Sequence, residues 1–135
     1  MIQSKIYQAG LDVGSTTAKC VLIDEQGNIV FSEYVRHNTR IVETVVEIIT
    51  KIMLRLGKEI NLSIKVTGSA GMGISERTGV SFVQEVIAAS EVVKTKYPEV
   101  RTLVDMGGED SKMIFFFPNR PIIYPPLSYC PKAGF

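Results

Sequence analysis

Two segments of the sequence combine a carboxylate, glycine and short polar side chains in an order that suits phosphate binding. One reads Asp12-Val-Gly-Ser-Thr-Thr-Ala-Lys-Cys-Val21, and the other reads Asp105-Met-Gly-Gly-Glu-Asp-Ser-Lys-Met-Ile114. Both follow the pattern Asp-x-Gly-x-x-x-small-Lys-x-aliphatic. A single turn of this kind is common and mostly structural. Two copies with matched spacing indicate instead that the chain uses the turn to bind an anion.

Glycines and backbone N–H groups supply the binding chemistry of these turns. A glycine removes the Cβ that would block the close approach of an anion, and successive N–H groups in a turn can point at one phosphate. The residues predicted to bind the phosphates are Gly14, Ser15, Thr16, Thr17, Lys19, Gly107, Gly108 and Lys112. The two lysines occupy alternating strand positions, where a solvated side chain is more common than a functional one, and both interpretations remain open.

The carboxylates of the two turns need a different role, because like charges repel. Asp12 and Asp105 are predicted to hold Mg2+ through its water molecules. The metal and the backbone donors would stabilise charge on a transferring phosphoryl group, with the two turns on opposite sides of one nucleotide. Glu109 follows the second glycine turn directly and is predicted to orient the attacking water, with Asp110 as the next candidate.

Hydrophobic periodicity predicts the elements that carry these turns. Apolar and β-branched runs predict strands, and recurrence at helical spacing predicts helices. The predicted strands are 6–13, 18–24, 29–36, 62–67, 101–106 and 112–117, and the predicted helices are 41–56 and about 83–96. Asn38 or Thr39 is predicted to cap the first helix, and Gly57 to end it. A glycine loop is expected at 68–73, and the prolines from Pro118 onward exclude a later helix or central strand.

Composition limits the classes of protein to consider. The chain has 135 residues, of which 45% are apolar and 21% charged, and this composition excludes a disordered chain. A net charge of +1 argues against a nucleic-acid partner. No apolar run approaches the roughly 18 residues of a membrane span, and a cytoplasmic location is the default. Two cysteines and one histidine are too few for a closed zinc site.

Two residues outside the turns could do chemistry, but their positions favour plainer roles. Cys20 lies within the second predicted strand and is expected to be a small buried apolar residue. His37 lies where a strand joins a helix and is expected to be a surface loop residue rather than a general base.

The two turns resemble the phosphate-1 and phosphate-2 motifs of the sugar kinase, Hsp70 and actin ATPases. The narrower sequence Gly107-Gly-Glu-Asp-Ser-Lys112, together with Val66-Thr-Gly68, resembles the ATPase activators of 2-hydroxyacyl-CoA dehydratases. These activators belong to the BadF/BadG/BcrA/BcrD family, which also serves benzoyl-CoA reductases. The resemblance covers about residues 5 to 117.

This resemblance implies an α/β fold, a ribonuclease H-like, actin-like ATPase lobe of order β-β-β-α-β-α. Residues 1–98 would be the first lobe, and residues 99–135 the truncated start of a duplicated second lobe. The resemblance also implies ATP or ADP with Mg2+, a homodimer that shares one [4Fe-4S] cluster in the full-length protein, and an acyl-CoA dehydratase or reductase partner. ATP hydrolysis would drive a low-potential electron into that partner. The 135-residue chain alone is expected to be inactive.

Cys130 tests the cluster that the resemblance implies. It lies 25 residues after Asp105, where the family has a cluster cysteine that opens a Cys-x-x-Gly-x-Gly turn. The segment Cys130-Pro-Lys-Ala-Gly-Phe135 lacks the full glycine pattern, so a free thiol is the competing interpretation. Two other functions remain open on the same fold: a small-molecule kinase, and a non-enzymatic actin-like nucleotide-binding protein.

Overall fold

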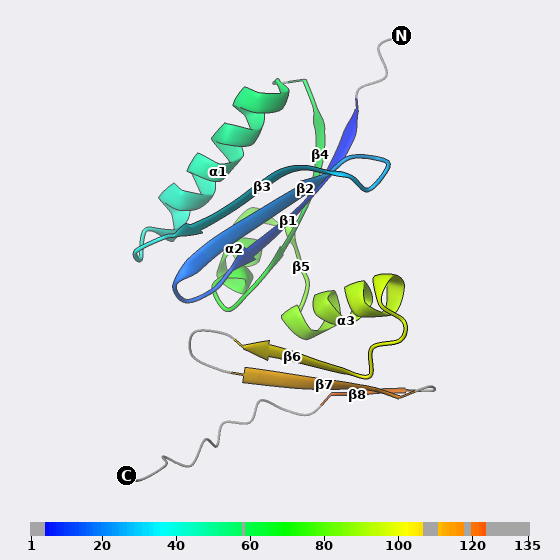
Figure 1. Cartoon of the computed structure of the whole chain (residues 1–135). Coiled ribbons are helices and arrows are strands. Elements are labelled where there is room, and N and C mark those ends of the chain that lie inside the picture. The colour runs from blue at the N-terminus through cyan, green and yellow to red at the C-terminus, as the bar shows by residue number, and fades with distance from the viewer. Residues whose placement is uncertain (1–4, 58, 107–110, 118–119, 124–135) are drawn as a thin grey trace. The chain divides into compact units, whose positions relative to one another are not determined.

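The structure is a computed structural model that describes residues 5–57, 59–106, 111–117 and 120–123. The chain divides into two compact units, Met1–Val83 and Gln84–Phe135. Both units combine strands with helices, and the predicted α/β class is confirmed (Figure 1).

The first unit is built on a five-stranded sheet with the order β3-β2-β1-β4-β5. Its strands are β1 (Ile6–Val13), β2 (Thr17–Ile23), β3 (Ile29–Arg36), β4 (Asn61–Thr67) and β5 (Ser81–Phe82). β1 pairs antiparallel with β2, and β2 pairs antiparallel with β3. β4 pairs parallel with β1, and β5 pairs parallel with β4. The carboxyl ends of β1 and β4 therefore lie side by side.

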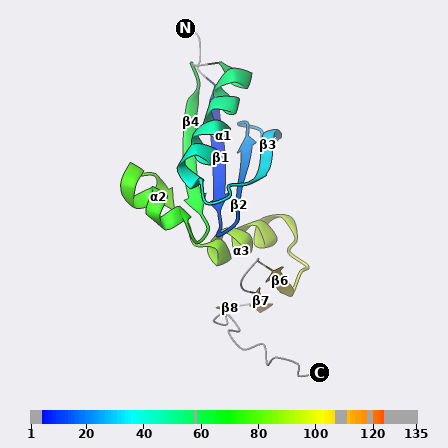
Figure 2. The same ribbon diagram turned by 90° about the vertical axis from the view of Figure 1, so that its left-hand side faces the viewer.

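Helix α1 (Ile41–Leu56) covers one face of this sheet (Figure 2). Ile48 and Ile52 of α1 are buried in one cluster with alternate residues of the strands, including Leu11 of β1 and Cys20 and Leu22 of β2. Because successive side chains of a strand point to opposite faces, Asp12 lies on the sheet face away from this core. The alternation of buried and exposed residues along β1 thus places the Asp12 carboxylate on the face opposite α1.

The two ends of α1 differ from each other in how well the sequence predicts them. Gly57 ends the helix with φ 91°, and its N–H donates to the Met53 carbonyl, as predicted. The predicted cap at Asn38 or Thr39 is wrong, because Arg40 is the N-cap residue and no side chain caps the helix. Asn38 and Thr39 instead adopt left-handed backbone angles.

Helix α2 (Gly71–Thr78) and strand β5 are additions that the sequence pattern did not predict. The segment 71–78 has no sustained apolar period and two glycines, so its helical signal is weak. Gly71 fits tightly here, since a Cβ on it would lie 3.1 Å from a methyl carbon of Val66. Gly79 then ends the helix in the left-handed conformation.

The second unit contains helix α3 (Glu85–Lys96) and strands β6 (Thr102–Met106), β7 (Ser111–Phe117) and β8 (Arg120–Ile123). The strands form an antiparallel sheet in the order β6-β7-β8, and the predicted hairpin is confirmed. β8 contains Pro121 and lies at the sheet edge, where proline is tolerated. The lobe boundary at residue 98 stays a prediction, and α3 groups with the second unit. Within the described ranges, no helix is long and apolar enough to cross a membrane.

Candidate functional site

The β1–β2 turn, Gly14–Thr16, carries the first candidate site. The N–H of Gly14 donates to the Thr17 carbonyl at 2.9 Å, which closes the turn. Ser15 and Thr16 are exposed. A Cβ added to Gly14 would meet only the Thr17 carbonyl oxygen, at 3.8 Å. The space beside Gly14 is therefore open, as the approach of a phosphate requires.

Asp12 and Lys19 face each other directly across this hairpin. They are register partners in the β1–β2 ladder, and Lys19 Nζ donates to Asp12 Oδ2 at 3.0 Å. The same ammonium lies 5.6 Å from the ring centroid of Tyr34 on β3. The structure thus holds the Lys19 charge beside the Asp12 carboxylate in a solvent-exposed ion pair, and a role of Lys19 in phosphate binding stays a prediction.

The segment after β4 forms a second wall of the site, where the sequence predicted only a glycine loop at 68–73. Gly68 has φ +95°, and a Cβ on it would lie 2.3 Å from the Val13 carbonyl oxygen and 2.7 Å from Asp12 Oδ1. The N–H of Ala70 donates to that Val13 carbonyl at 2.9 Å. Only glycine permits this backbone to touch the end of β1.

Thr67 adds a hydroxyl group beside Asp12. The two residues are register partners in the parallel β1–β4 pair. The Thr67 hydroxyl is buried and has no hydrogen-bond partner in the part of the chain that the structure describes. A buried unpartnered hydroxyl is a place where water or a ligand is expected. Together with the half-exposed Asp12 carboxylate it fits a site for hydrated Mg2+. The tripeptide Val66-Thr-Gly68 was the only sequence signal for Thr67.

His37 occupies a place that the sequence interpretation did not assign to it. The side chain is buried, with 3% of its surface exposed, so the predicted surface location is wrong. Its Nε2 lies 3.0 Å from the Gly14 carbonyl oxygen, and its Nδ1 accepts a hydrogen bond from the Thr39 N–H. Local sequence could not reveal this contact, because Gly14 and His37 are far apart in the chain.

The second candidate turn repeats the register of the first. Asp105 of β6 and Lys112 of β7 are direct partners in the antiparallel ladder, as Asp12 and Lys19 are in theirs. Lys112 forms an ion pair with Glu85 of α3. Gly107, Gly108, Glu109 and Asp110 lie outside the described residues.

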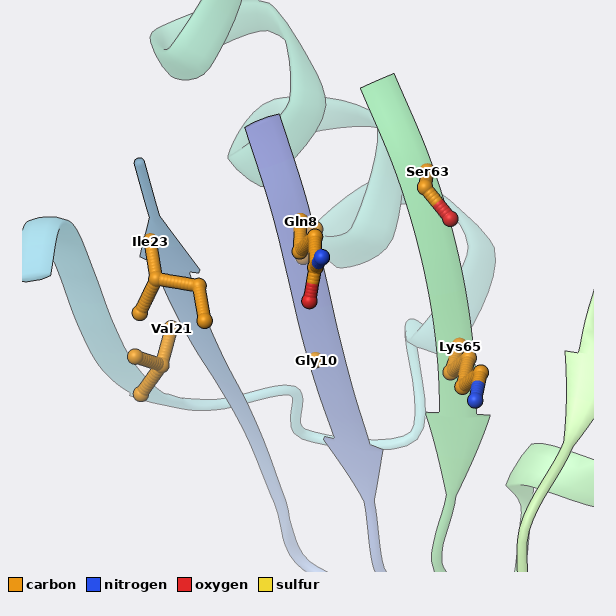
Figure 3. A pocket seen from close by; sticks show the side chains of 7 residues that line it. Gln8, Gly10, Val21, Ile23, Ser63 and Lys65 are labelled. Carbon is orange, nitrogen blue, oxygen red and sulfur yellow. The ribbon is translucent and has the colours of Figure 1, made fainter. Parts of the chain in front are cut away.

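A depression lies on the β1–β2–β4 surface (Figure 3). It has a volume of about 440 Å³ and forms over Gly10, which has no side chain. Lys65 is a charged residue that lines it. It lacks a convergent set of polar groups, and we assign no chemistry to it.

The cysteines divide into one that the structure describes and one that it does not. Cys20 is buried, as predicted, and no group of three or more metal-ligating side chains occurs within the described ranges. Burial, with a smaller effect of the Glu33 charge, raises the pKa of the Cys20 thiol to about 11. Such a thiol does not fit a cluster ligand. Cys130 lies outside the described residues.

The Cys20 thiol is expected to react slowly in the folded protein. Its pKa rises from 9.0 to about 11, and the thiolate population at pH 8 should fall about a hundredfold. In a C130S variant, the rate of reaction with a disulfide reagent should fall by at least that factor relative to the same chain in denaturant. The free energy of unfolding should also decrease as pH rises from 9 towards 11, because the unfolded thiol ionises first. Equal rates in both states would contradict the burial of Cys20.

Comparisons with known proteins agree on one family. Residues 9–121 match the model of the BadF/BadG/BcrA/BcrD ATPase family. The chain is 30% identical to the 2-hydroxyisocaproyl-CoA dehydratase activator of Clostridioides difficile, over 81% of this chain and 41% of the relative.

Two solved structures have the same fold. Component A of (R)-2-hydroxyglutaryl-CoA dehydratase from Acidaminococcus fermentans matches with TM-score 0.69 and 26% identity, over 84% of this chain and 44% of that one. The activator of 2-hydroxyisocaproyl-CoA dehydratase from Clostridium difficile with bound ADPNP matches with TM-score 0.67 and 26% identity, over 87% and 45%. The chain therefore spans less than half the length of these relatives.

Proposed function

The chain belongs to the BadF/BadG/BcrA/BcrD ATPase family, and on that premise we propose that the full-length protein is an ATP-hydrolysing activator of an acyl-CoA dehydratase or reductase. The observation that carries the proposal is the β1–β2 turn, in which an open glycine, exposed hydroxyls and a carboxylate lie together. A relative of the same fold has the ATP analogue ADPNP bound.

In this proposal both turns contact the phosphates of one ATP. Ser15, Thr16 and Thr17 supply N–H and hydroxyl donors, Gly14 leaves the space into which the phosphate fits, and Lys19 adds positive charge. Gly107, Gly108 and Lys112 do the same from the second turn. Mg2+, when bound, neutralises charge that develops on the transferring phosphoryl group. Its waters would be held by Asp12 and Asp105.

The attacking water needs an orienting group as well as a stabilised phosphoryl group. Glu109 is proposed to orient this water, with Asp110 as the next candidate. Positioning and electrostatic stabilisation supply most of the catalysis in phosphoryl transfer, so no strong general base is required.

The activator role adds a redox partner to the ATPase. We propose that the full-length homodimer shares a [4Fe-4S] cluster, to which Cys130 is the candidate ligand from this chain. Hydrolysis would be coupled to low-potential electron transfer into the dehydratase or reductase component. A cytoplasmic location and the absence of a nucleic-acid or membrane partner belong to the same proposal.

A comparison of the full-length protein with the 135-residue chain tests the ATPase proposal. We expect steady-state ATP hydrolysis by the full-length protein and little or none by the chain alone, because the chain spans less than half of its relatives. Binding energy from remote parts of a substrate normally supplies much of catalysis. Robust turnover by the 135-residue chain would contradict this expectation.

The same preparation distinguishes the activator from its two alternatives. Cluster absorbance after anaerobic reconstitution, with ATP-dependent activation of a dehydratase component, would support the activator. Transfer of the γ-phosphate to a sugar or pantothenate would favour a kinase, and nucleotide-dependent filaments in light scattering would favour an actin-like protein.

A further inference from the structure

His37 is a buried ionisable side chain that touches the β1–β2 turn without belonging to it. It follows β3 directly and precedes α1, and its ring is 3% exposed. Both of its ring nitrogens have backbone partners: the Gly14 carbonyl for Nε2, at 3.0 Å, and the Thr39 N–H for Nδ1, at 3.2 Å. The ring therefore joins the start of α1 to the turn.

These contacts fix the tautomer of the imidazole. The Thr39 N–H can only donate, so Nδ1 must accept and carries no proton. Nε2 then carries the proton and donates to the Gly14 carbonyl. With both nitrogens engaged in this way, the ring holds the backbone and is not placed to act as a general base.

His37 fixes the direction of two peptide units of the turn. Its side chain holds the Gly14 carbonyl, and its backbone N–H donates to the Thr16 carbonyl at 3.2 Å. In a planar trans peptide, the N–H of the next residue points opposite to the carbonyl. The N–H groups of Ser15 and Thr17 therefore point away from His37. The carbonyl oxygens of Gly14 and Thr16, which would repel an anion, stay on the His37 side.

The backbone after His37 is strained to make this contact. Asn38 has φ 47° and Thr39 has φ 67°, two consecutive non-glycine residues in the left-handed region. For a β-branched residue such as threonine this is a genuine outlier. Strain of this kind persists only where the surroundings over-determine it, and it clusters at functional sites. Here it places the Thr39 N–H on Nδ1.

We propose that His37 is a positioning residue that orients the N–H donors of the β1–β2 turn towards nucleotide phosphate. This inference rests on the proposed function, in which the turn binds ATP. It goes beyond that function because it assigns a specific role to a residue outside the glycine turn. The ligand chemistry concerned is the phosphate chain and not the nucleoside.

Binding of ADP and of adenosine to the full-length protein, each by calorimetry with Mg2+, tests the role. H37L removes the donor to Gly14 and keeps an apolar group in the buried space. We expect it to lower ADP affinity about tenfold or more and to change adenosine affinity less than twofold. H37Q, whose amide can donate to the same carbonyl, should keep ADP affinity within about threefold of wild type. A merely structural role would lower both affinities together.

T39G is the matched control, because it relieves the strain at φ 67° and keeps the N–H that donates to Nδ1. It should leave ADP affinity unchanged. If H37L does not fold, H37N takes its place, since its shorter amide cannot reach the Gly14 carbonyl. An unchanged ratio of ADP to adenosine affinity in H37L or H37N would overturn the inference. A wild-type protein that binds no ADP would instead overturn the proposed function.

Discussion

Replacing Asp12 by asparagine is expected to lower kcat for ATP hydrolysis by about a hundredfold in the full-length protein, with a change in ATP affinity below about tenfold. The amide keeps the shape of the side chain but loses the charge that would organise the waters of Mg2+. It also loses the charge that pairs with Lys19. Charge develops mainly in the transition state, so the rate should fall more than the affinity. Asp105→Asn should follow the same order of effects.

Asp24→Asn is the matched control for this experiment. Asp24 follows β2 at the end opposite the candidate site, and its carboxylate accepts hydrogen bonds from the N–H groups of Gln26 and Asn28. The bonds to Asn28, above all, lower the pKa of Asp24. The control should keep hydrolysis within about twofold while it weakens a turn. Single-turnover hydrolysis and nucleotide titration would be measured for both variants. Unchanged hydrolysis in Asp12→Asn would remove Asp12 from the proposed machinery.

Gly68→Ala is expected to lower the free energy of unfolding by at least about 2 kcal/mol. The new Cβ would lie 2.3 Å from the Val13 carbonyl oxygen, and the residue already has φ +95°. Val13 is the buried last residue of β1 and Gly68 directly follows β4, so neither backbone can move freely. The displaced segment also borders Asp12, and ATP affinity should fall with stability. Urea unfolding of the variant and of wild type measures the difference.

Gly73→Ala, in the same segment, is expected not to lower the free energy of unfolding and serves as the control for Gly68→Ala. Gly73 lies within α2, and a Cβ on it would meet nothing within 4 Å. Alanine is favoured over glycine in a helix by up to about 1 kcal/mol, so this variant should be as stable as wild type or more stable. Equal destabilisation by the two substitutions would show that the Gly68 contact is not the cause.

Sequence reasoning predicted the elements whose pattern repeats locally. β1, β3 and α1 have the predicted bounds, because their apolar residues recur with the period of a strand or a helix along consecutive positions. The repeated spacing of Asp and Lys was visible in the sequence, but the direct pairing of each Asp with its Lys across the hairpin came from the structure. α2 escaped prediction because its sequence carries little apolar periodicity.

The parts of the candidate site that sequence reasoning missed depend on contacts between distant segments. The burial of His37 follows from the approach of β3 to the β1–β2 turn, and the need for Gly68 follows from its contact with Val13. The helix cap was misassigned at Asn38 and Thr39 because their left-handed angles serve the His37 contact. No local pattern encodes such pairings.

The position of β1 between β2 and β4 has a consequence for how the site assembles. The β1–β2 hairpin involves neighbours in sequence and can close early, whereas the pairing of β1 with β4 must wait until the intervening strands and helix have closed a long loop. We therefore expect the hairpin turn to form early in folding and its partners Thr67 and Gly68 to join it late. A ligand that needs both stabilises the whole first unit by mass action and not the hairpin alone. Occupancy of the site would then report that the unit has finished folding.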